Sequence, residues 1–138
     1  MNKPAVVVGM SGGVDSSVTA YLLKDTHELH GIFMKNWEDK QDDICPAEQD
    51  YADAKGVAKQ LNIPMSSVNF VEAYWQKVFQ TCLDDFANGN TPNPDILCNK
   101  EIKFNCFLEH AIAQGAEKIA TGHYARVIEN EGIYALHR

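Results

Sequence analysis

Short runs of β-branched residues alternate with longer runs of helical period along the 138 residues of the chain. The first run, at residues 5–8, is Ala-Val-Val-Val followed by Gly9, which is typical of a strand buried on both faces. Comparable runs follow, and the last of them indicates a hairpin or a strand that leaves the domain. The predicted strands cover residues 5–8, 29–34, 65–70 and 118–121, with the hairpin at 126–128 and 133–136.

The segments between these strands carry the spacing of amphipathic helices, most clearly at residues 72–87, where six apolar residues recur at helical intervals. They are Trp75, Val78, Phe79, Cys82, Leu83 and Phe86. In a helix predicted at 16–24, four apolar residues fit one face: Val18, Tyr21, Leu22 and Leu23. The remaining helices are predicted from the second half of the acidic stretch 38–53 to about Leu61, and over about 101–114. Alternating strands and helices predict an α/β fold, one domain over residues 1–138, with a parallel sheet covered by helices on both faces.

Composition narrows the class of protein without naming a function. Hydrophobic residues make up 45% and charged residues 22%, as in ordinary globular domains. The net charge of −7 argues against a free-standing basic nucleic-acid binder, because binding to phosphates needs an excess of lysine and arginine on some face. With no membrane-length apolar run and no signal-peptide pattern, we expect a cytoplasmic protein with reduced thiols and no membrane partner. The last residues stop in mid-pattern, so we expect a truncated chain.

The glycine turn after the first strand is the clearest candidate site. Residues 9–17 read Gly-Met-Ser-Gly-Gly-Val-Asp-Ser-Ser, between a buried strand and a helix. Gly12 and Gly13 permit positive φ and let backbone N–H groups approach an anion. Neighbouring hydroxyls and the positive helix N-terminus favour a phosphate at the same place. A carboxylate beside a phosphate needs a cation, so Asp15 is either a Mg²⁺ ligand or the helix N-cap.

Two familiar phosphate motifs are excluded here. The Walker A motif needs a lysine after its last glycine, and Val14 stands there instead. The Rossmann motif GxGxxG fails because Ser11 holds the place of its second glycine. A plain tight turn capped by an aspartate is the alternative interpretation, but such a turn has no need of two adjacent glycines and three hydroxyls.

A second candidate is the proline-rich segment before the helix at 101–114. Pro92 and Pro94 restrain the backbone and so hold Asn93 and Asp95 in place, which suits recognition. Cys98 is predicted at or just before the first turn of that helix. Lys100 and Lys103 follow it. Because helix N-termini and ammonium groups both lower the pKa of a thiol, Cys98 is predicted to be the reactive cysteine.

The other three cysteines indicate less chemistry. Cys82 lies on an apolar helical stripe and Cys106 among apolar residues, so both are predicted to be buried. Cys45 lies in the acidic stretch, where carboxylates would raise its pKa. A zinc site built from these thiols and a histidine would lack the short ligand spacing that such sites prefer.

Four motifs together resemble a known family. Residues 11–16, Ser-Gly-Gly-Val-Asp-Ser, look like the SGGxDS loop of the PP-loop ATP pyrophosphatases, which split ATP between the α- and β-phosphates and adenylate a substrate oxygen. Residues 91–104, with 33–37 and 120–125, resemble in the same order the tRNA-specific 2-thiouridylase (MnmA/TrmU) family within that superfamily. The resemblance runs from about residue 5 to the end.

The resemblance implies an adenine-nucleotide α-hydrolase-like fold, and it assigns roles to individual residues. It implies that ATP is bound by Gly9, Met10, Ser11, Gly12, Gly13, Val14, Asp15, Ser16, Met34 and Gly122. It also implies that Asn93, Pro94 and Asp95 contact the target base and that Cys98, with Asp95, is catalytic. For Met34 the alternative is core packing. For His123 a structural role beside the turn is preferred.

The implied reaction uses ATP and Mg²⁺ to adenylate the C2 oxygen of the wobble uridine in tRNA, and then replaces that oxygen with sulfur. A sulfur carrier protein would deliver the persulfide, and in the family a second cysteine downstream bears it. No cysteine follows Cys106. One alternative is that Cys106 or Cys82 takes the place of the second cysteine, but the helix pattern disfavours it. We therefore expect the second cysteine, and the domains that grip tRNA, to lie beyond Arg138. The alternatives are another PP-loop enzyme, of the amidotransferase-synthetase or cytidine-directed ligase type, and a nucleotide-sensing module without turnover.

Overall fold

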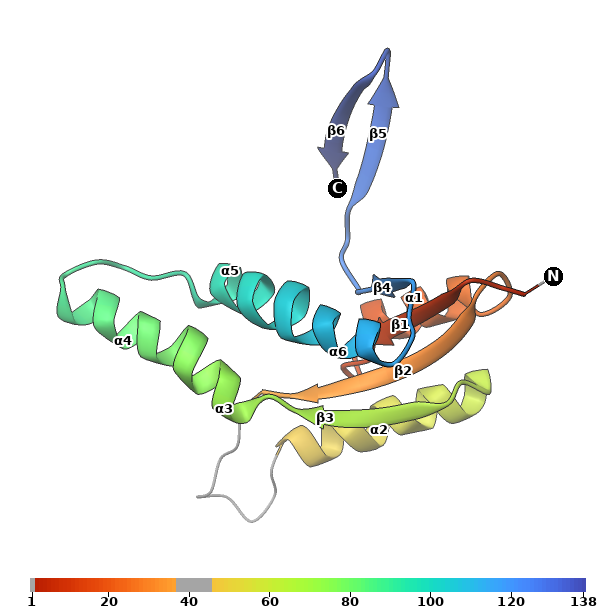
Figure 1. The fold of residues 1–138 in the computed structure, drawn as a ribbon, viewed down its shortest axis with the longest axis horizontal. Coiled ribbons are helices and arrows are strands. Elements are labelled where there is room, and N and C mark those ends of the chain that lie inside the picture. The colour runs from red at the N-terminus through yellow and green to blue at the C-terminus, as the bar shows by residue number, and fades with distance from the viewer. Residues whose placement is uncertain (1, 37–45) are drawn as a thin grey trace.

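A computed structural model describes residues 2–36 and 46–138. Four parallel strands form one sheet in the order β3-β2-β1-β4 (Figure 1). Their bounds are β1 Ala5–Gly9, β2 Glu28–Lys35, β3 Met65–Asn69 and β4 Lys118–Ala120. In the central pair, Val6 lies opposite Leu29 and Val8 opposite Gly31. The predicted parallel α/β sheet is confirmed.

Helices cover both faces of this sheet, as predicted. On one face, α1 and α2 pack through Ala20 and Ala54 against alternate strand residues such as Val8. On the other face, Phe107 of α6 packs against Val7 and its neighbours. The alternation places successive residues of β1 in two separate cores. The helices around the sheet are α1 Val14–Leu23, α2 Pro46–Leu61 and α6 Phe107–Ala113.

Two helical arms extend beyond the sheet and lie side by side (Figure 1). The first arm consists of α3 Val71–Tyr74, the π-helix η1 Trp75–Phe79 and α4 Gln80–Ala87. The second arm consists of α5 Pro94–Cys98, the π-helix η2 Asn99–Cys106 and α6. The first arm matches the helix predicted at 72–87, although only Val78 and Cys82 of its apolar stripe are buried. Three of the six stripe residues, Trp75, Leu83 and Phe86, stay exposed, because the first arm packs mainly against the second arm.

The apolar face predicted for the first helix is largely exposed. Val18, Tyr21 and Leu22 of α1 face solvent, while the small residues Ser16 and Ala20 are buried toward the sheet. Close packing of α1 on the sheet explains the difference, because only small side chains fit between them. Of the four residues predicted on the apolar face, only Leu23 packs against the core, so the prediction is wrong for the other three.

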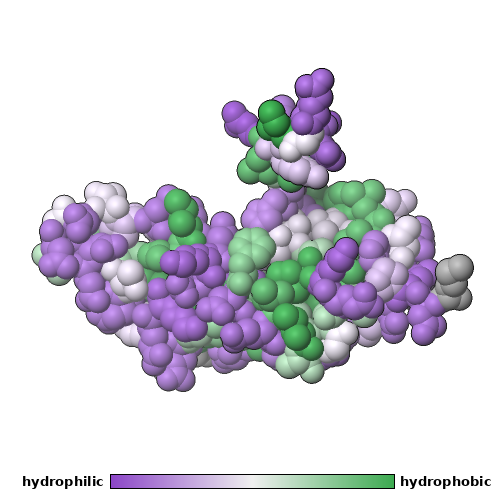
Figure 2. Space-filling model, turned by 45° about the horizontal axis from the view of Figure 1, so that its top comes forward, coloured by the Kyte–Doolittle hydropathy of each residue, from purple (hydrophilic) through white to green (hydrophobic). Residues whose placement is uncertain are grey.

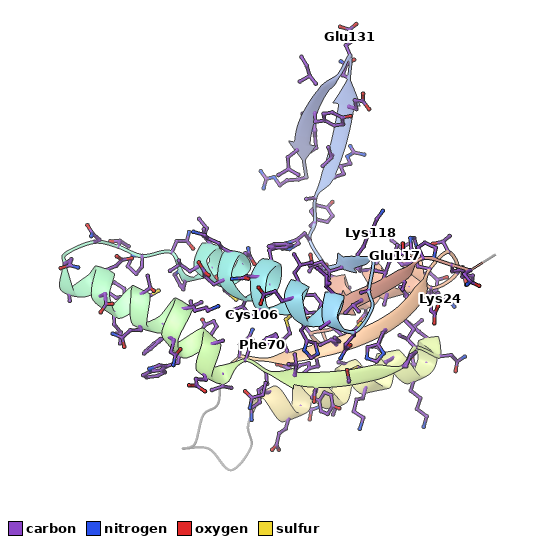
Figure 3. The ribbon with its side chains drawn as sticks, in the orientation of Figure 1. Lys24, Phe70, Cys106, Glu117, Lys118 and Glu131 are labelled. Atoms are coloured by element: carbon purple, nitrogen blue, oxygen red, sulfur yellow. The ribbon has the colours of Figure 1, made fainter. Side chains whose placement is uncertain are left out.

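The chain then forms a hairpin of β5 Arg126–Asn130 and β6 Ile133–His137, which projects away from the sheet (Figure 1). Glu131 lies at its tip (Figure 3). Hydrophobic surface is visible on the hairpin in Figure 2, and the exposed side chains include Val127, Ile133 and Leu136. Among the residues described, no helix combines the length and the apolar character that crossing a bilayer requires.

Candidate nucleotide and thiol site

A cavity of about 590 Å³ opens at the carboxyl ends of the strands. This is the edge at which open parallel sheets bind ligands. The loop after β1 forms one wall, and the end of β2 forms another. The lining residues named by the sequence are Gly9, Met10, Ser11, Gly13, Val14, Asp15, Ser16, Met34 and Gly122. The structure thus brings together nine of the ten residues predicted to bind ATP.

Gly12 is the tenth residue predicted to bind ATP, and it packs against the backbone of α2 instead of lining the cavity. Its φ of +86° lies in the left-handed region, and a Cβ there would come within 2.6 Å of the carbonyl oxygen of Asp50 in α2. Gly122 is also held by close approach, because a Cβ on it would meet the backbone nitrogen of Ser16 at 2.6 Å. Both glycines let backbone segments pack closer than any side chain would allow.

Gly13 differs from the prediction. Its φ is −82°, so it does not use left-handed backbone, and it forms the N-cap of α1. Asp15 is the second residue of that helix, within its first turn, and is exposed, so the alternative interpretation of Asp15 as the N-cap is wrong. Its carboxylate therefore remains available at the cavity wall.

Hydroxyl groups brace the loop internally. Ser16 is buried, and its Oγ accepts a hydrogen bond from the N–H of Ser11 at 3.2 Å and donates to the carbonyl of Gly13 at 3.3 Å. The Oγ of Ser17 donates to the same carbonyl at 2.7 Å. At least two of the three predicted hydroxyls thus hold the loop in shape, which preorganises it for an anion.

The end of β2 forms the opposite wall. Met34 is half-buried there; it packs against the core beside Phe107, and its Cε lies 3.4 Å from the position of a Cβ on Gly9. It therefore satisfies both the core-packing and the cavity-lining interpretations. Nearby, Asn36 also lines the cavity, and its buried Oδ1 has no hydrogen-bond partner among the described residues. A buried acceptor in that position suits a ligand with an amino group.

The helix that carries Cys98 begins earlier than predicted. α5 starts at Pro94 rather than near residue 101, and the Oδ1 of Asn93 caps it by accepting from the N–H of Ile96 at 3.3 Å. The Asn-Pro pair is an N-cap followed by proline at N1, a start signal that was interpreted as loop stiffening. Cys98 therefore ends α5 instead of lying in the first turn of a helix.

This shift changes the electrostatics of the thiol. Burial raises the pKa of Cys98, and Asp95 raises it further, while Lys103 acts in the opposite direction. The net direction is upward, so the predicted low pKa is wrong for the chain alone. The thiol is nevertheless only half-buried, so a reagent can approach it.

The remaining thiols divide as follows. Cys82 is buried, as predicted. Cys106 is only half-buried, and its Sγ accepts from the Nζ of Lys77 at 3.6 Å, so its predicted burial is wrong. It lies on the second arm (Figure 3). Cys45 falls outside the described residues. In residues 2–36 and 46–138, no group of three or more His, Cys, Asp or Glu side chains could hold a metal ion.

Two further predicted positions lie near this region. Asp95 is exposed in the first turn of α5. His123 is exposed, its backbone N–H donates to the carbonyl of Thr121 at 3.2 Å, and its ring stacks on Phe104 with centroids 6.0 Å apart. Because any residue here could form this backbone bond, the structural role preferred for His123 stays a prediction.

Sequence reasoning missed several lining residues. Asp50 of α2, Lys103 of η2 and Asn36 after β2 all line the cavity, as does Lys35. Asp50 arrives through the packing of α2 against Gly12, which no local pattern reveals. For Lys103, the only indication in the sequence that it belongs to the site was its position five residues after Cys98.

Comparisons with known proteins agree with this geometry. The family model described as the tRNA methyl transferase HUP domain matches residues 4–138. The chain belongs to this family. Among curated relatives, the HUP domain is 56% identical over 140 residues to "tRNA-specific 2-thiouridylase MnmA 1" of Geobacillus kaustophilus, covering 100% of the chain and 38% of that protein. It is 59% identical over 126 residues to "tRNA-specific 2-thiouridylase MnmA" of Legionella pneumophila, covering 90% of the chain and 35% of the relative. The chain thus spans under two-fifths of these relatives.

Solved structures share the fold of this HUP domain. The U34-tRNA thiolase NcsA of Methanococcus maripaludis, solved with its [4Fe-4S] cluster, superimposes with a TM-score of 0.60 at 23% identity, over 89% of the chain and 39% of NcsA. A predicted tRNA methyltransferase subunit of Methanocaldococcus jannaschii gives a TM-score of 0.56 at 20% identity, over 87% and 53% of the two chains. At these identities the likeness establishes the fold alone.

Proposed function

We propose that this domain is the catalytic HUP domain of an ATP-dependent tRNA 2-thiouridylase. The observation that carries the proposal is the meeting of two features: a glycine-loop cavity at the sheet edge, and a half-buried thiol, Cys98, coupled to that cavity through Lys103. The names of the curated relatives, 56–60% identical, support the same activity. Nucleotide binding alone would need only the first feature.

The proposal places ATP in the cavity in one orientation. The phosphates would lie against the loop of residues 9–16, where backbone amides and the N-terminus of α1 favour an anion. The adenine would lie at the end of β2, where Met34 offers an apolar contact and the Oδ1 of Asn36 can accept from the exocyclic amino group. Gly122, in the segment after β4, lines the cavity on a further side.

Mg²⁺ fits the same cavity through oxygen ligands. Asp15 and Asp50 both line it, and carboxylate and phosphate oxygens are the donors that this cation prefers. When bound, the ion would neutralise phosphate charge during adenyl transfer. The two carboxylates would hold it beside the loop, and would repel an unaccompanied triphosphate.

The proposed reaction needs both the glycine-loop cavity and the thiol of Cys98. The C2 oxygen of uridine is a poor leaving group, so its attack on the α-phosphate, with release of pyrophosphate, would convert it into an adenylate. A persulfide sulfur would then attack C2 and displace AMP. Attack by the partner cysteine on the inner sulfur would free the 2-thiouridine and leave a disulfide, which a thiol reductant must reopen before the next turnover.

The second arm supplies the groups for the later steps. Cys98 would be the partner cysteine, and Asn93, Pro94 and Asp95 would lie against the target base. The exposed start of α5 leaves Pro94 and Asp95 accessible to tRNA. The persulfide-bearing cysteine and the sulfur carrier protein lie outside this domain in our proposal, and the protein would act in the cytoplasm on the wobble uridine.

The decisive experiment compares two cysteine variants of the protein that carries this domain. We expect Cys98→Ser to abolish 2-thiouridine formation on unmodified tRNA while ATP affinity is retained. Cys106→Ser is the matched control, because Cys106 is also half-buried, and this variant should thiolate tRNA normally. Nucleoside mass spectrometry distinguishes thiolation from methylation. Normal 2-thiouridine in Cys98→Ser would remove this thiol from the reaction.

The 138-residue chain alone gives a second test. We expect it to bind ATP without thiolating tRNA, because in our proposal the persulfide-bearing cysteine lies outside this domain. Sulfur incorporation by the isolated chain would contradict this. Full modification of tRNA by the protein after alkylation of Cys98 would favour another PP-loop enzyme, because the proposed sulfur transfer needs this thiol. Absence of pyrophosphate release from ATP and tRNA in the full protein would favour a sensing module.

A further inference from the structure

Lys103 connects two parts of the molecule that are otherwise separate. It lines the cavity together with the loop of residues 9–16, although it belongs to the second helical arm. Among the lining residues of the described chain, it alone comes from either arm. Within residues 2–36 and 46–138, no ion pair involves its ammonium group. A half-buried cation at the wall of a phosphate-sized cavity is suited to bind an anion.

The π-helix explains how Lys103 and Cys98 come together. In an α-helix, residues five apart point about 140° away from each other, because each residue turns the chain by about 100°. η2 begins at Asn99, directly after Cys98, and closes its hydrogen bonds at i+5. Residues five apart then return to nearly the same side. The wider turn thus brings the Lys103 ammonium toward both the thiol and the cavity.

The surroundings of the thiol give this cation a specific effect. Burial and Asp95 raise the pKa of Cys98, and Lys103 is the group that lowers it. From the facing first arm, Tyr74 interacts with this thiol: burial, Cys98, Cys82 and Asp95 together raise the pKa of Tyr74. The groups facing Cys98 are therefore acidic or neutral, with Lys103 as the opposing charge.

We propose that Lys103 is a shared cation, which binds the phosphates of the nucleotide and also stabilises the thiolate of Cys98. This inference rests on the proposed function, since it takes the cavity as the nucleotide site. It adds that the phosphates in the nucleotide site control the protonation of Cys98. While the phosphates engage the ammonium, less of its charge acts on the sulfur, so the thiol stays protonated. When pyrophosphate departs, the ammonium is released toward Cys98, which then becomes nucleophilic at the step that needs it.

Two measurements on the same variants test the proposal. The first is the pH profile of iodoacetamide alkylation at Cys98, resolved by peptide mass spectrometry from the other cysteines. The second is the affinity for a non-hydrolysable ATP analogue. For Lys103→Met we expect alkylation at neutral pH to fall at least about threefold and nucleotide affinity to fall about tenfold. Lys103→Arg should restore both, because it retains the charge.

Lys100→Met is the matched control, because Lys100 is one helical turn away, 75% exposed, and within 3.9 Å of Glu101. It should leave both measurements unchanged. In the wild type, the ATP analogue should shift the alkylation profile of Cys98 toward higher pH, and this shift should shrink in Lys103→Met. Circular dichroism confirms that each variant is folded.

The outcomes separate this inference from the proposed function. Failure of wild-type protein to bind the ATP analogue would refute the nucleotide site itself. If wild-type protein binds the analogue but Lys103→Met changes only one of the two measurements, or neither, the shared cation is refuted while the nucleotide site stands. An equal effect of Lys100→Met would show that only overall charge matters and would also refute it.

Discussion

The glycine loop of residues 9–16 and the segment of residues 94–103 meet at one cavity, but they are held by different forces. The loop is fixed by contact: Gly122 and Gly12 lie where a Cβ would overlap backbone atoms. The thiol-bearing segment is shaped by opposing effects of burial and charge on Cys98. A close backbone contact tolerates almost no added side-chain volume. The balance of burial and charge that sets the pKa of Cys98 can instead be shifted gradually.

This difference suits the two tasks. A site that places the phosphates of ATP gains from a rigid, preorganised backbone. A thiol that must react only at one step gains from a protonation state that its surroundings can alter. Substitutions in the loop should therefore act on stability and binding together, and substitutions around Cys98 should act on reactivity with small effects on stability.

The largest effect is expected for Gly122→Ala. The new Cβ would meet the backbone nitrogen of Ser16 at 2.6 Å and the carbonyl carbon of Asp15 at 2.7 Å, so either β4 or α1 must move. We expect a loss of about 3 kcal/mol in the free energy of unfolding, by urea denaturation, and loss of measurable ATP binding. Gly56→Ala is the control, since nothing lies within 4 Å of its Cβ position and alanine favours the helix. Equal free energies of unfolding for the two variants would show that β4 can shift at little energetic cost.

A smaller effect is expected for Ser16→Ala. It removes the acceptor of the Ser11 N–H and a donor to the carbonyl of Gly13, both inside the loop. We expect a loss of about 1–2 kcal/mol in the free energy of unfolding, with weaker ATP binding by calorimetry. Thr19→Ala removes an exposed hydroxyl that bonds the carbonyl of Asp15 and serves as the control. Unchanged ATP affinity in Ser16→Ala would mean that the loop is rigid without this network.

The loop was predictable from sequence because its determinants are local. The β-branched run of β1, the adjacent glycines and the helix that follows are consecutive, and each restricts the backbone independently of distant residues. The same holds for the sheet and for the helices on its faces. What the pattern missed in this region, such as the packing of Asp50 against Gly12, depends on how α2 crosses the loop.

The thiol segment was less predictable because its determinants are not local. A period of 3.6 residues does not reveal a π-helix, so the sequence named Lys100 and Lys103 together as neighbours of Cys98 and did not single out Lys103. The pKa of Cys98 depends on burial, and the first arm packs against the helix α5 that carries this thiol, which sequence spacing does not show. Cys106 likewise appeared buried among apolar neighbours, although Lys77 of the first arm reaches it.

Asn93→Ala tests whether the start of α5 is structural, functional or both. Loss of the cap to the Ile96 N–H should lower the free energy of unfolding by about 1 kcal/mol. Asn93→Asp keeps a capping oxygen and should retain stability. If Asn93 also contacts the target base, Asn93→Asp should still lose thiolation in the full protein. Full activity of Asn93→Asp would restrict this residue to capping.

The smallest effect should appear at alkaline pH. The folded state raises the pKa of Cys98, mainly through burial, so the fold favours the protonated thiol. This contribution to stability is complete below the pKa of the unfolded thiol and is lost as the pH rises through the raised pKa of the folded state. The unfolding temperature should therefore fall as the pH passes the ordinary thiol value of 9.0, and should fall less in Cys98→Ser. Cys106→Ser is the control.

Tyr74, whose pKa is also raised, contributes in the same direction, so the residual fall should disappear in Cys98→Ser combined with Tyr74→Phe. An identical fall in all variants would place the alkaline sensitivity elsewhere and would show that the second arm, like the loop, is held by contact alone.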